Sequence, residues 1–553
     1  MEKIEKIAKE VEEGNIEHKL ILRPDGERLI QLVSQLKWRL AEGMGEAQYE
    51  LGVSDDGYLV GLTSEELESS VRILSEMAES LDADTSIMRK VKVEHNVHTS
   101  PLAKRFLIHQ GNTSEERYAV EVLVRQRSKV LCPEIRCLVF GHLNVGKTSL
   151  LGLLADGDLD DGQGSTRLNI LRHRHEVESG TTSCITQKSI GFSSNGSIVR
   201  SDIYWAEGSL EKSILESSSK VVTFIDTSGN PKYAKTLFSG FLGLPNYLCF
   251  VVSVLETGLT QYELELLKMS QVLNEVPSFL VATKIDLVDD NGLQKFLEAI
   301  RRQLQLPFIK SIPLVVNNEN DISTCVSKLQ IGIIPIFCIS NVTGKNVFML
   351  EKFLNLLPYH SFHSKNILND LEFQIDEIFY IPHVGSVVGG LVLNGTIKVG
   401  EVYQIGPFTG GIAIPVEIKT IHRQRSVINE LLSGQAGTVC ICLLDGSPFI
   451  QHSKKYKLGK GMAILKTPKF ENIIHANVEV ISNEKSIKLS INMTGKVFIG
   501  SLQCNGTIKT LTNIENKRYS ISIELTSLEW FKTGLKLIFY SSSNGLKCAG
   551  DVK

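Results

Sequence analysis

The sequence predicts a small N-terminal α/β domain, a central α/β domain with a mostly parallel sheet, and two C-terminal β-barrels. Three observations support this. The 553 residues are enough for roughly three or four domains. In the middle of the chain, short apolar runs alternate with helical stretches, which is typical of a parallel sheet covered on both faces. Beyond residue 363, apolar residues recur at every second position, which is typical of barrels.

The first region, residues 1–130, combines helical and strand patterns. We expect helices at 27–40 and 64–81, and strands near 49–53 and 90–93. Trp38 lies on the first of these helices, and we expect it to be buried in the core of the domain rather than to form a platform for a ligand. These patterns predict a small α/β domain, and no motif in it indicates a chemistry of its own.

The second region, residues 131–362, contains the apolar runs expected to form the parallel sheet. They lie at 135–140, 221–225, 247–254, 279–282 and 334–339. Ligands of such sheets bind at the carboxyl ends of the strands. Functional residues are therefore expected directly after each run.

The third region alternates apolar and polar residues in many short strands. Ile412, Ile414, Val416 and Ile418 form one such pattern, and residues 519–525 form another. Thr467-Pro468 marks a seam between two halves. We expect one barrel over 363–467 and a second over 468–553.

Composition limits the classes of function. The 59 Lys and Arg residues against 62 Asp and Glu leave a net charge of −3, so nucleic-acid contact requires a local basic surface. The charged start lacks the apolar stretch of a signal peptide, and no apolar run is long enough to span a bilayer. Ten scattered cysteines suit a reducing compartment. We expect a cytoplasmic protein with no membrane partner.

The first run of the central domain is followed by Gly141-His142-Leu143-Asn144-Val145-Gly146-Lys147-Thr148-Ser149. This matches G-x-x-x-x-G-K-[ST] between a strand and a helix, so it predicts a phosphate-binding loop (P-loop). Its glycines allow backbone N–H groups to turn toward the phosphates, and the helix N-terminus adds positive partial charge. Lys147 is expected to reach the β and γ phosphates, and the Thr148 hydroxyl to bind Mg²⁺. The nucleotide-binding residues expected in this loop are Gly141, Asn144, Val145, Gly146, Lys147, Thr148 and Ser149.

The second run ends in Asp226-Thr227-Ser228-Gly229. A carboxylate at the end of a buried strand is costly unless it serves a charge, and a phosphate-bound Mg²⁺ supplies one. We expect Asp226 to hold that ion and the Gly229 N–H to bond the γ-phosphate.

Two later motifs indicate the base. In Thr283-Lys284-Ile285-Asp286, the Asp286 carboxylate can accept two hydrogen bonds from guanine that adenine does not offer, and the Lys284 stem can cover the base. Ser340 and Asn341 would close the pocket with backbone donors. The ordered motifs predict GTP and GDP as ligands, and they disfavour the alternative of a metabolic kinase with the same loop.

The sequence also resembles the translation-factor GTPases, and among them the elongation-factor-like group of GTP-binding proteins 1 and 2. Besides the P-loop, the stretches that carry the resemblance are 36–43, 52–53, 59–62, 158–164, 172–180, 339–344, 373–376 and 384–390. The resemblance implies a P-loop GTPase domain followed by two barrels, and hydrolysis of GTP to GDP and phosphate. It also implies GTP-dependent contact with tRNA, the ribosome or RNA-decay machinery, in translation or RNA surveillance. It places Thr182 in the first switch, where the family's threonine meets Mg²⁺ and the γ-phosphate.

One departure from the family pattern concerns catalysis, for which the expected residues are Lys147, Thr182, Gly229 and Asn230. The family usually has His after the Gly of Asp-x-x-Gly, where it positions the attacking water, whereas this chain has Asn230 followed by Pro231. An amide cannot become cationic, so we expect slow hydrolysis. Two alternatives stay open: Asn230 orients the water adequately, or the chain is a GTP-sensing binding module whose hydrolysis is very slow or lost.

Other departures are milder. Asn144 replaces the usual Asp and either ligates a monovalent cation or stabilises the loop through a hydrogen bond. Thr283 replaces the commoner Asn and shortens a strut between loops. Basic clusters at 172–175, 422–425 and 454–457 are either solvated faces or contacts to RNA phosphates.

Overall fold

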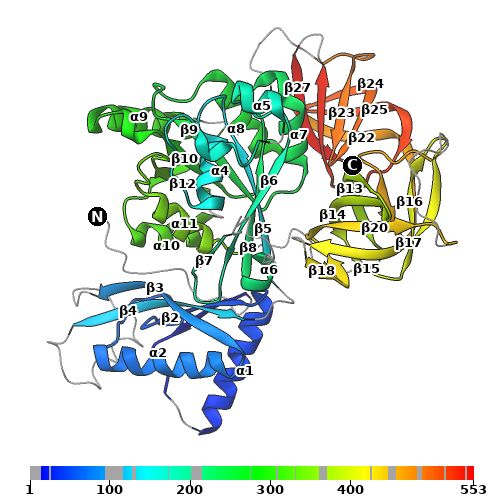
Figure 1. Ribbon diagram of the computed structural model, residues 1–553. Coiled ribbons are helices and arrows are strands. Elements are labelled where there is room, and N and C mark those ends of the chain that lie inside the picture. The colour runs from blue at the N-terminus through cyan, green and yellow to red at the C-terminus, as the bar shows by residue number, and fades with distance from the viewer. Residues whose placement is uncertain are drawn as a thin grey trace.

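The computed structural model confirms the predicted fold class (Figure 1). It describes residues 14–23, 26–93, 116–127, 132–171, 173–200, 214–273, 276–306, 309, 311–329, 332–359, 370–423, 426–445, 456–481, 489–515, 518–541 and 545–553. The N-terminal sheet lies beside one end of the central domain, and the two barrels lie together on another side of it (Figure 1). The division at residues 130 and 362 falls outside the described residues and stays a prediction.

The N-terminal domain is a four-stranded sheet with two helices. Its strand order is β1 (Ile16–Lys19), β2 (Glu46–Leu51), β4 (Arg117–Gln126) and β3 (Ala83–Val93). The helices are α1 (Gly26–Glu42) and α2 (Ser64–Glu79), and Thr63 and Glu66 form a capping box at the start of α2. The core contains Leu36, Tyr49, Leu74 and Val122.

The prediction that Trp38 is buried is wrong. Its side chain is 43% exposed, and the Arg39 guanidinium lies 4.9 Å from the centre of its ring. Leu36 and Leu40 are one helical turn apart on the buried stripe of α1, so Trp38 between them projects from another face.

The central domain has an eight-stranded sheet that includes all five predicted strands. The order is β11 (Ile312–Val315), β12 (Ile333–Cys338), β10 (Ser278–Thr283), β9 (Tyr247–Ser253), β5 (Glu134–Phe140), β8 (Lys220–Asp226), β6 (Thr186–Phe192) and β7 (Ile198–Val199). The pairs from β11 to β8 are parallel, whereas β6 pairs antiparallel with both β8 and β7.

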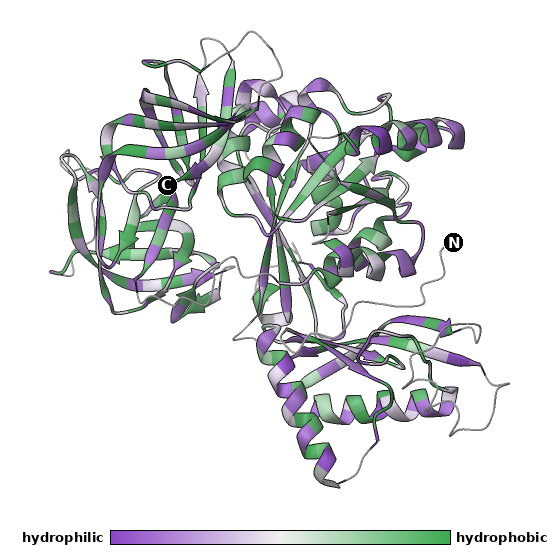
Figure 2. Cartoon of the chain, turned by 180° about the vertical axis from the view of Figure 1, so that it is seen from behind, coloured by the Kyte–Doolittle hydropathy of each residue, from purple (hydrophilic) through white to green (hydrophobic). Residues whose placement is uncertain are grey.

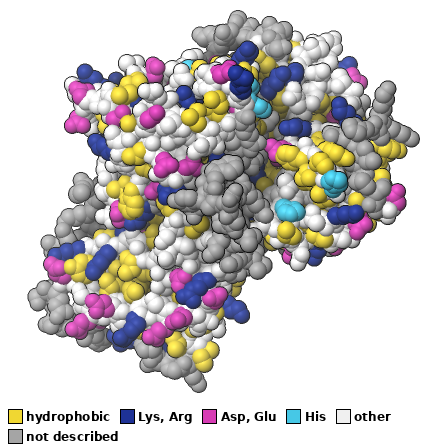
Figure 3. Space-filling view, viewed as in Figure 1, with side chains coloured by type: hydrophobic (Ala, Val, Ile, Leu, Met, Phe, Trp, Pro, Cys, Tyr) yellow, Lys and Arg dark blue, Asp and Glu magenta, His cyan; other side chains and the backbone are white. Residues whose placement is uncertain are grey.

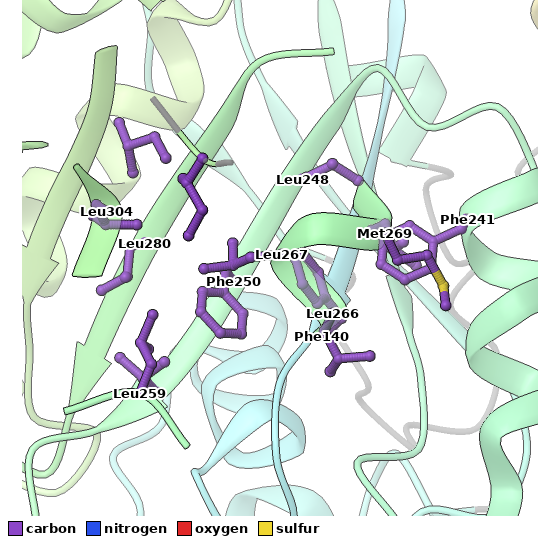
Figure 4. Close-up of a cluster of buried hydrophobic side chains, with 14 of the residues drawn as sticks. Phe140, Phe241, Leu248, Phe250, Leu259, Leu266, Leu267, Met269, Leu280 and Leu304 are labelled. Atoms are coloured by element: carbon purple, nitrogen blue, oxygen red, sulfur yellow. The ribbon is translucent and has the colours of Figure 1, made fainter. Parts of the chain in front are cut away.

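Helices cover both faces of this sheet. The main ones are α4 (Lys147–Asp156), α7 (Ala234–Leu242), α8 (Gln261–Leu273), α9 (Asp290–Leu304), α10 (Glu319–Lys328) and α11 (Val347–Leu356). Strand residues alternate between two cores: Phe140 and Phe250 stack with centroids 4.9 Å apart in one, and Phe279 and Phe337 lie in the other. Figure 4 shows the first core, and Figure 2 shows the hydrophobic character of the central strands.

The C-terminal half contains two closed barrels. The first joins β13 (Glu372–Ile381), β14 (Gly385–Asn394), β20 (Ala436–Cys442), β17 (Ile412–Arg423), β16 (Val402–Phe408) and β21 (Ala463–Leu465), and it closes through the β16–β17 and β16–β21 pairs. Short strands β15 (Thr396–Lys398), β18 (Ser426–Ile428) and β19 (Glu430–Leu432) flank it. The second joins β22 (Glu471–Val480), β25 (Arg518–Glu529), β24 (Leu502–Glu515), β23 (Thr494–Ile499), β26 (Lys536–Ser541) and β27 (Leu546–Val552).

Buried contacts connect the domains to the central sheet. The Phe238 ring of α7 lies 5.4 Å from Phe498 of the second barrel. Arg423 of the first barrel pairs with Glu134 at 3.2 Å, and both side chains are almost fully buried. None of the helices in the described parts of the chain has both the length and the apolar character needed to cross a membrane.

Candidate functional site

A cleft of about 210 Å³ opens beside the carboxyl ends of the central strands. Many of the predicted site residues line it: Asn144, Gly146, Lys147, Thr148, Ser149, Thr182, Gly229 and Lys284. The other predicted residues lie outside its lining: Gly141, Val145, Asp226, Asn230, Thr283, Asp286, Ser340 and Asn341.

The P-loop wraps around the amino group of its own lysine. Gly141 has φ of +150° and Gly146 has φ of +89°, conformations that glycine adopts with little strain. Lys147 begins α4, and its Nζ donates to the carbonyl oxygens of Gly141 (3.2 Å) and His142 (2.7 Å). Burial lowers the pKa of Lys147 to about 8, opposed by the carboxylates of Asp226 and Glu263. The loop therefore holds a buried ammonium at the mouth of a helix N-terminus.

Three oxygen-bearing side chains converge beside this lysine. The Thr148 hydroxyl donates to Asp226 Oδ2 at 2.8 Å and lies 2.8 Å from the Thr182 hydroxyl oxygen, which is 3.5 Å from the same carboxylate oxygen. Burial raises the pKa of Asp226 to about 6, although the positive charge of the nearby Lys147 acts to lower it.

This oxygen cluster suits a hard cation. Asp226 Oδ1 is buried and has no hydrogen-bond partner among the described residues. A buried carboxylate oxygen without a partner is costly unless a cation or another donor compensates it. Two hydroxyls and a carboxylate are the ligand types that Mg²⁺ prefers, so the residues present fit that ion.

Glu176 positions the segment that carries Thr182. It is fully buried in the short helix α5 (Arg174–Ser179), and its Oε1 accepts from the Ser183 N–H and hydroxyl, both at 2.7 Å, and from the Cys184 N–H at 3.1 Å. Burial alone would raise the pKa of Glu176, but these hydrogen bonds outweigh it and lower the pKa to about 2. The carboxylate thus fixes the backbone directly after Thr182.

The same segment brings potential metal-ligand atoms of His173, Glu176 and Cys184 within 4.8 Å of one another. Spacing in the sequence did not indicate this group. Since Glu176 already accepts several hydrogen bonds from this segment, the group is explained by the fold itself.

Gly229 lies against the P-loop, whereas Asn230 is not among the residues that line the cleft. A Cβ added at Gly229 would contact Lys147 Nζ and lie 2.5 Å from the His142 carbonyl oxygen. The Asn230 side-chain oxygen accepts from the Lys232 N–H at 3.0 Å, which caps the 3₁₀ turn Pro231–Tyr233. The amide oxygen that would orient a water is engaged in this cap.

The predicted base-side loops are connected to the P-loop. The Thr283 hydroxyl lies 2.6 Å from the Val145 carbonyl oxygen, Lys284 Nζ donates to the Asn144 carbonyl oxygen at 2.7 Å, and Asn341 Nδ2 donates to the Gly146 carbonyl oxygen at 3.4 Å. Thr283 therefore bridges the loops despite its short side chain. Asp286 is exposed in the 3₁₀ turn Ile285–Leu287.

Sequence reasoning missed one wall of the cleft. Asp160, Gly162, Gln163, Gly164 and Arg167 line it, together with Gly180 and Thr181. Asp160 donates its N–H to the Asn341 carbonyl oxygen at 3.0 Å, so this segment reaches the base-side loops. The available signal was the pair Gly162 and Gly164, which follow α4 in a stretch that carries the family resemblance.

The predicted basic clusters differ in their exposure to solvent. Arg423 is buried and paired with Glu134, so for this residue both predictions, a solvated face and a contact to RNA phosphates, are wrong. Arg174 is 93% exposed and paired with Glu178. Residues 172, 424–425 and 454–455 lie outside the described residues.

Comparisons with known proteins agree with this fold. Residues 133–359 match the family model described as the elongation factor Tu GTP binding domain. GTP-binding protein 2 of Homo sapiens is 32% identical over 548 residues, covering 96% of this chain and 85% of that protein. GTP-binding protein 1 of Xenopus laevis is 34% identical over 499 residues, covering 89% and 71%. The S. cerevisiae Ski7 GTPase-like domain, solved bound to GTP, aligns with a TM-score of 0.56 at 14% identity over 76% of this chain and 97% of that one.

Proposed function

We propose the function of this chain from one premise: it belongs to the family of GTP-binding proteins 1 and 2, a group of translation-factor-like GTPases. On this premise it is a molecular switch of the elongation-factor type that binds GTP and hydrolyses it to GDP and phosphate. The observation that supports this most strongly is the convergence of Thr148, Thr182 and Asp226 beside Lys147, three of the four lining the cleft.

Each residue has a role in this proposal. Lys147 gives up its two carbonyl partners to bind the β and γ phosphates, and the Gly229 N–H bonds the γ-phosphate. Thr148, Thr182 and Asp226 would hold Mg²⁺, which neutralises phosphate charge when bound. Glu176 holds the backbone of Ser183 and Cys184, directly after Thr182. Loss of the γ-phosphate would therefore release the Thr182 end of this segment, while the end held by Glu176 stays in place.

Guanine is selected beside the cleft, by the loops whose Lys284 and Asn341 side chains contact the P-loop. The Asp286 carboxylate accepts from the base, the Lys284 stem covers it, and backbone donors of Ser340 and Asn341 meet its oxygen. Competition with ATP tests this selection, since displacement of bound GTP by equimolar ATP would contradict it.

Hydrolysis is slow in this proposal because Asn230 cannot become cationic and caps the following turn instead. Single-turnover cleavage of GTP by wild type and Asn230→His tests this. Acceleration in the histidine variant supports the proposal, and an unchanged rate counts against it.

A second candidate function is a GTP-sensing binding module whose hydrolysis is lost. The cap made by Asn230 is the observation that favours it. Multiple-turnover phosphate release, with and without ribosomes, separates the two: release above background in either condition identifies the switch, and binding without release identifies the module.

Asn144 provides a further test of the P-loop. Its φ of +61° and its place in the cleft wall are compatible with a monovalent cation beside the phosphates. Equal hydrolysis rates in K⁺ and Na⁺ would rule out a K⁺-selective role.

The barrels present the partner-binding surface in this proposal, with tRNA, the ribosome or RNA-decay machinery as partner. Apolar side chains are exposed around the β13–β14 turn: Phe379 (42%), Tyr380 (49%), Ile381 (43%) and Val384 (48%). Figure 3 shows hydrophobic side chains gathered on the part of the molecule where the barrels lie in that view. Aromatic rings can stack on unpaired bases. Co-sedimentation with ribosomes in a non-hydrolysable GTP analogue, but not in GDP, would support this; equal sedimentation in both would contradict it.

A further inference from the structure

We infer that Arg167 contacts the phosphates of the bound nucleotide and stabilises the charge that develops when the γ-phosphate is cleaved. This rests on the proposed function, because it assigns a further catalytic residue to the same cleft. Arg167 was not among the residues predicted from the sequence, and the chain lacks a cationic side chain at position 230.

The first observation is the place of Arg167 in the cleft wall. It lines the same cleft as Lys147, Thr182 and Gly229. Its Nη1 donates to the carbonyl oxygen of Gly180 at 3.4 Å, only two residues before Thr182 in the sequence. The guanidinium therefore lies beside the segment that is expected to meet the γ-phosphate.

The second observation is that glycines make room for the guanidinium on both sides. A Cβ added at Gly164 would lie 2.5 Å from Arg167 Nε, and one added at Gly180 would lie 2.7 Å from Nη2. Both glycines also have positive φ, +93° and +64°. The side chain thus lies flat between two backbone segments that have no side chains there.

The third observation concerns the partners of the guanidinium. Besides Gly180, it donates to the Gln163 carbonyl oxygen at 3.2 Å, and no carboxylate forms an ion pair with it among the described residues. A guanidinium has five N–H donors that match phosphate oxygens in geometry. Most of the guanidinium's donors are therefore available to a ligand in the cleft.

The fourth observation is that the backbone carrying Arg167 is anchored. Arg167 ends the 3₁₀ turn Ser165–Arg167, in which the Thr166 hydroxyl donates to the Ser149 carbonyl oxygen of α4 at 3.2 Å. Asp160 Oδ1 accepts from the Thr166 N–H at 3.3 Å, and Asp161 Oδ1 accepts from the Ser165 N–H at 3.1 Å. A charge held in place before the reaction stabilises a transition state more effectively than one that must be ordered during it.

In the reaction, a water oxygen bonds to the γ-phosphorus, and the bond from that phosphorus to the β–γ bridging oxygen breaks. The electron pair stays on the bridging oxygen, which remains with GDP. One proton of the water stays on the oxygen now bonded to phosphorus, and the other passes to another oxygen of the released phosphate. Negative charge is spread over the phosphate oxygens as this occurs, and arginines placed in GTPase sites stabilise it. Arg167 supplies such a charge from within the same chain.

The test compares Arg167→Ala and Arg167→Lys with Arg174→Ala, a control in the same segment whose side chain is exposed and lies outside the cleft lining. Calorimetry with GTP and GDP comes first, and single-turnover hydrolysis follows. Arg167→Ala should lower the hydrolysis rate about 10²- to 10³-fold while changing GDP affinity far less, and Arg167→Lys should restore only part of the rate. Free guanidinium at low concentration should accelerate the alanine variant and leave the control unchanged.

A second measurement does not depend on turnover. Aluminium fluoride added to GDP imitates the phosphate in transfer, and wild type and Arg174→Ala should bind this pair more tightly than GDP alone, whereas Arg167→Ala should not. A hydrolysis rate of Arg167→Ala within about twofold of the wild-type rate would overturn the inference, even if the variant bound GDP and GTP equally more weakly. If wild type binds neither GTP nor GDP, the proposed function itself has failed, which is a separate result.

Discussion

Replacing Arg125 with alanine should lower the free energy of unfolding by about 3 kcal/mol, because Arg125 forms a buried ion pair and also contacts the central domain. Arg125 is 1% exposed and pairs with Glu46 at 2.7 Å. It also donates across the interface to the Ser193 carbonyl oxygen (3.0 Å), Asn355 Oδ1 (2.9 Å) and the Asn355 carbonyl oxygen (3.1 Å). Removing one partner of a buried pair costs about 3–5 kcal/mol. Lys220 still lies 3.3 Å from Glu46, so we expect the lower end of this range.

The assay is urea denaturation followed by circular dichroism, with Arg127→Ala as the matched control. Arg127 lies two residues further along the same strand region but is 45% exposed, and it pairs with Asp84 at the surface. An exposed pair of this kind contributes at most about 1 kcal/mol. Equal losses of unfolding free energy in the two variants would refute the view that the Arg125 contacts are a buried anchor between domains.

Three further predictions concern charge and space. Burial, with the charge of Glu121, raises the pKa of Glu50 to about 8. The folded chain therefore holds a proton that the unfolded chain has lost, so stability should fall by about 1 kcal/mol per unit as pH rises from about 5 to 8. Glu50→Gln should flatten this slope in thermal unfolding, and an unchanged slope would contradict the assignment. Thr182→Ala should weaken binding of GTP about tenfold, and of GDP much less, in Mg²⁺-containing calorimetry, because only GTP has the γ-phosphate. Gly229→Ala should reduce GTP affinity at least about tenfold, because the new Cβ would lie 2.5 Å from the His142 carbonyl oxygen; unchanged affinity would show that the loop moves freely.

Local patterns predicted much of the fold. The five buried strands of the central sheet, the P-loop between β5 and α4, and the alternating strands of the barrels are encoded in short stretches of sequence. Lys147, Thr148 and Asp226 could be brought together from sequence because parallel strands place their carboxyl ends at one edge.

Contacts between distant segments could not be predicted in this way. Arg423 looked like part of a basic surface, but its partner Glu134 is 289 residues away. Asn230 was expected beside the attacking water, yet its side chain caps the turn that begins at Pro231. Arg167 enters the cleft only because a 3₁₀ turn and two glycines hold it there, and no short motif marks that arrangement.

Calorimetric titration of wild type and Asp286→Asn with guanine and adenine nucleotides, in the presence of Mg²⁺, tests the central claim most directly. Wild type should release or absorb heat with GTP and GDP and not with ATP. The asparagine variant should lose most of its affinity for guanine nucleotides and gain affinity for xanthosine triphosphate. Xanthine has a carbonyl oxygen in place of guanine's 2-amino group, and this oxygen can accept a hydrogen bond from the new amide. A folded wild-type protein that gives no signal with either guanine nucleotide would contradict the account.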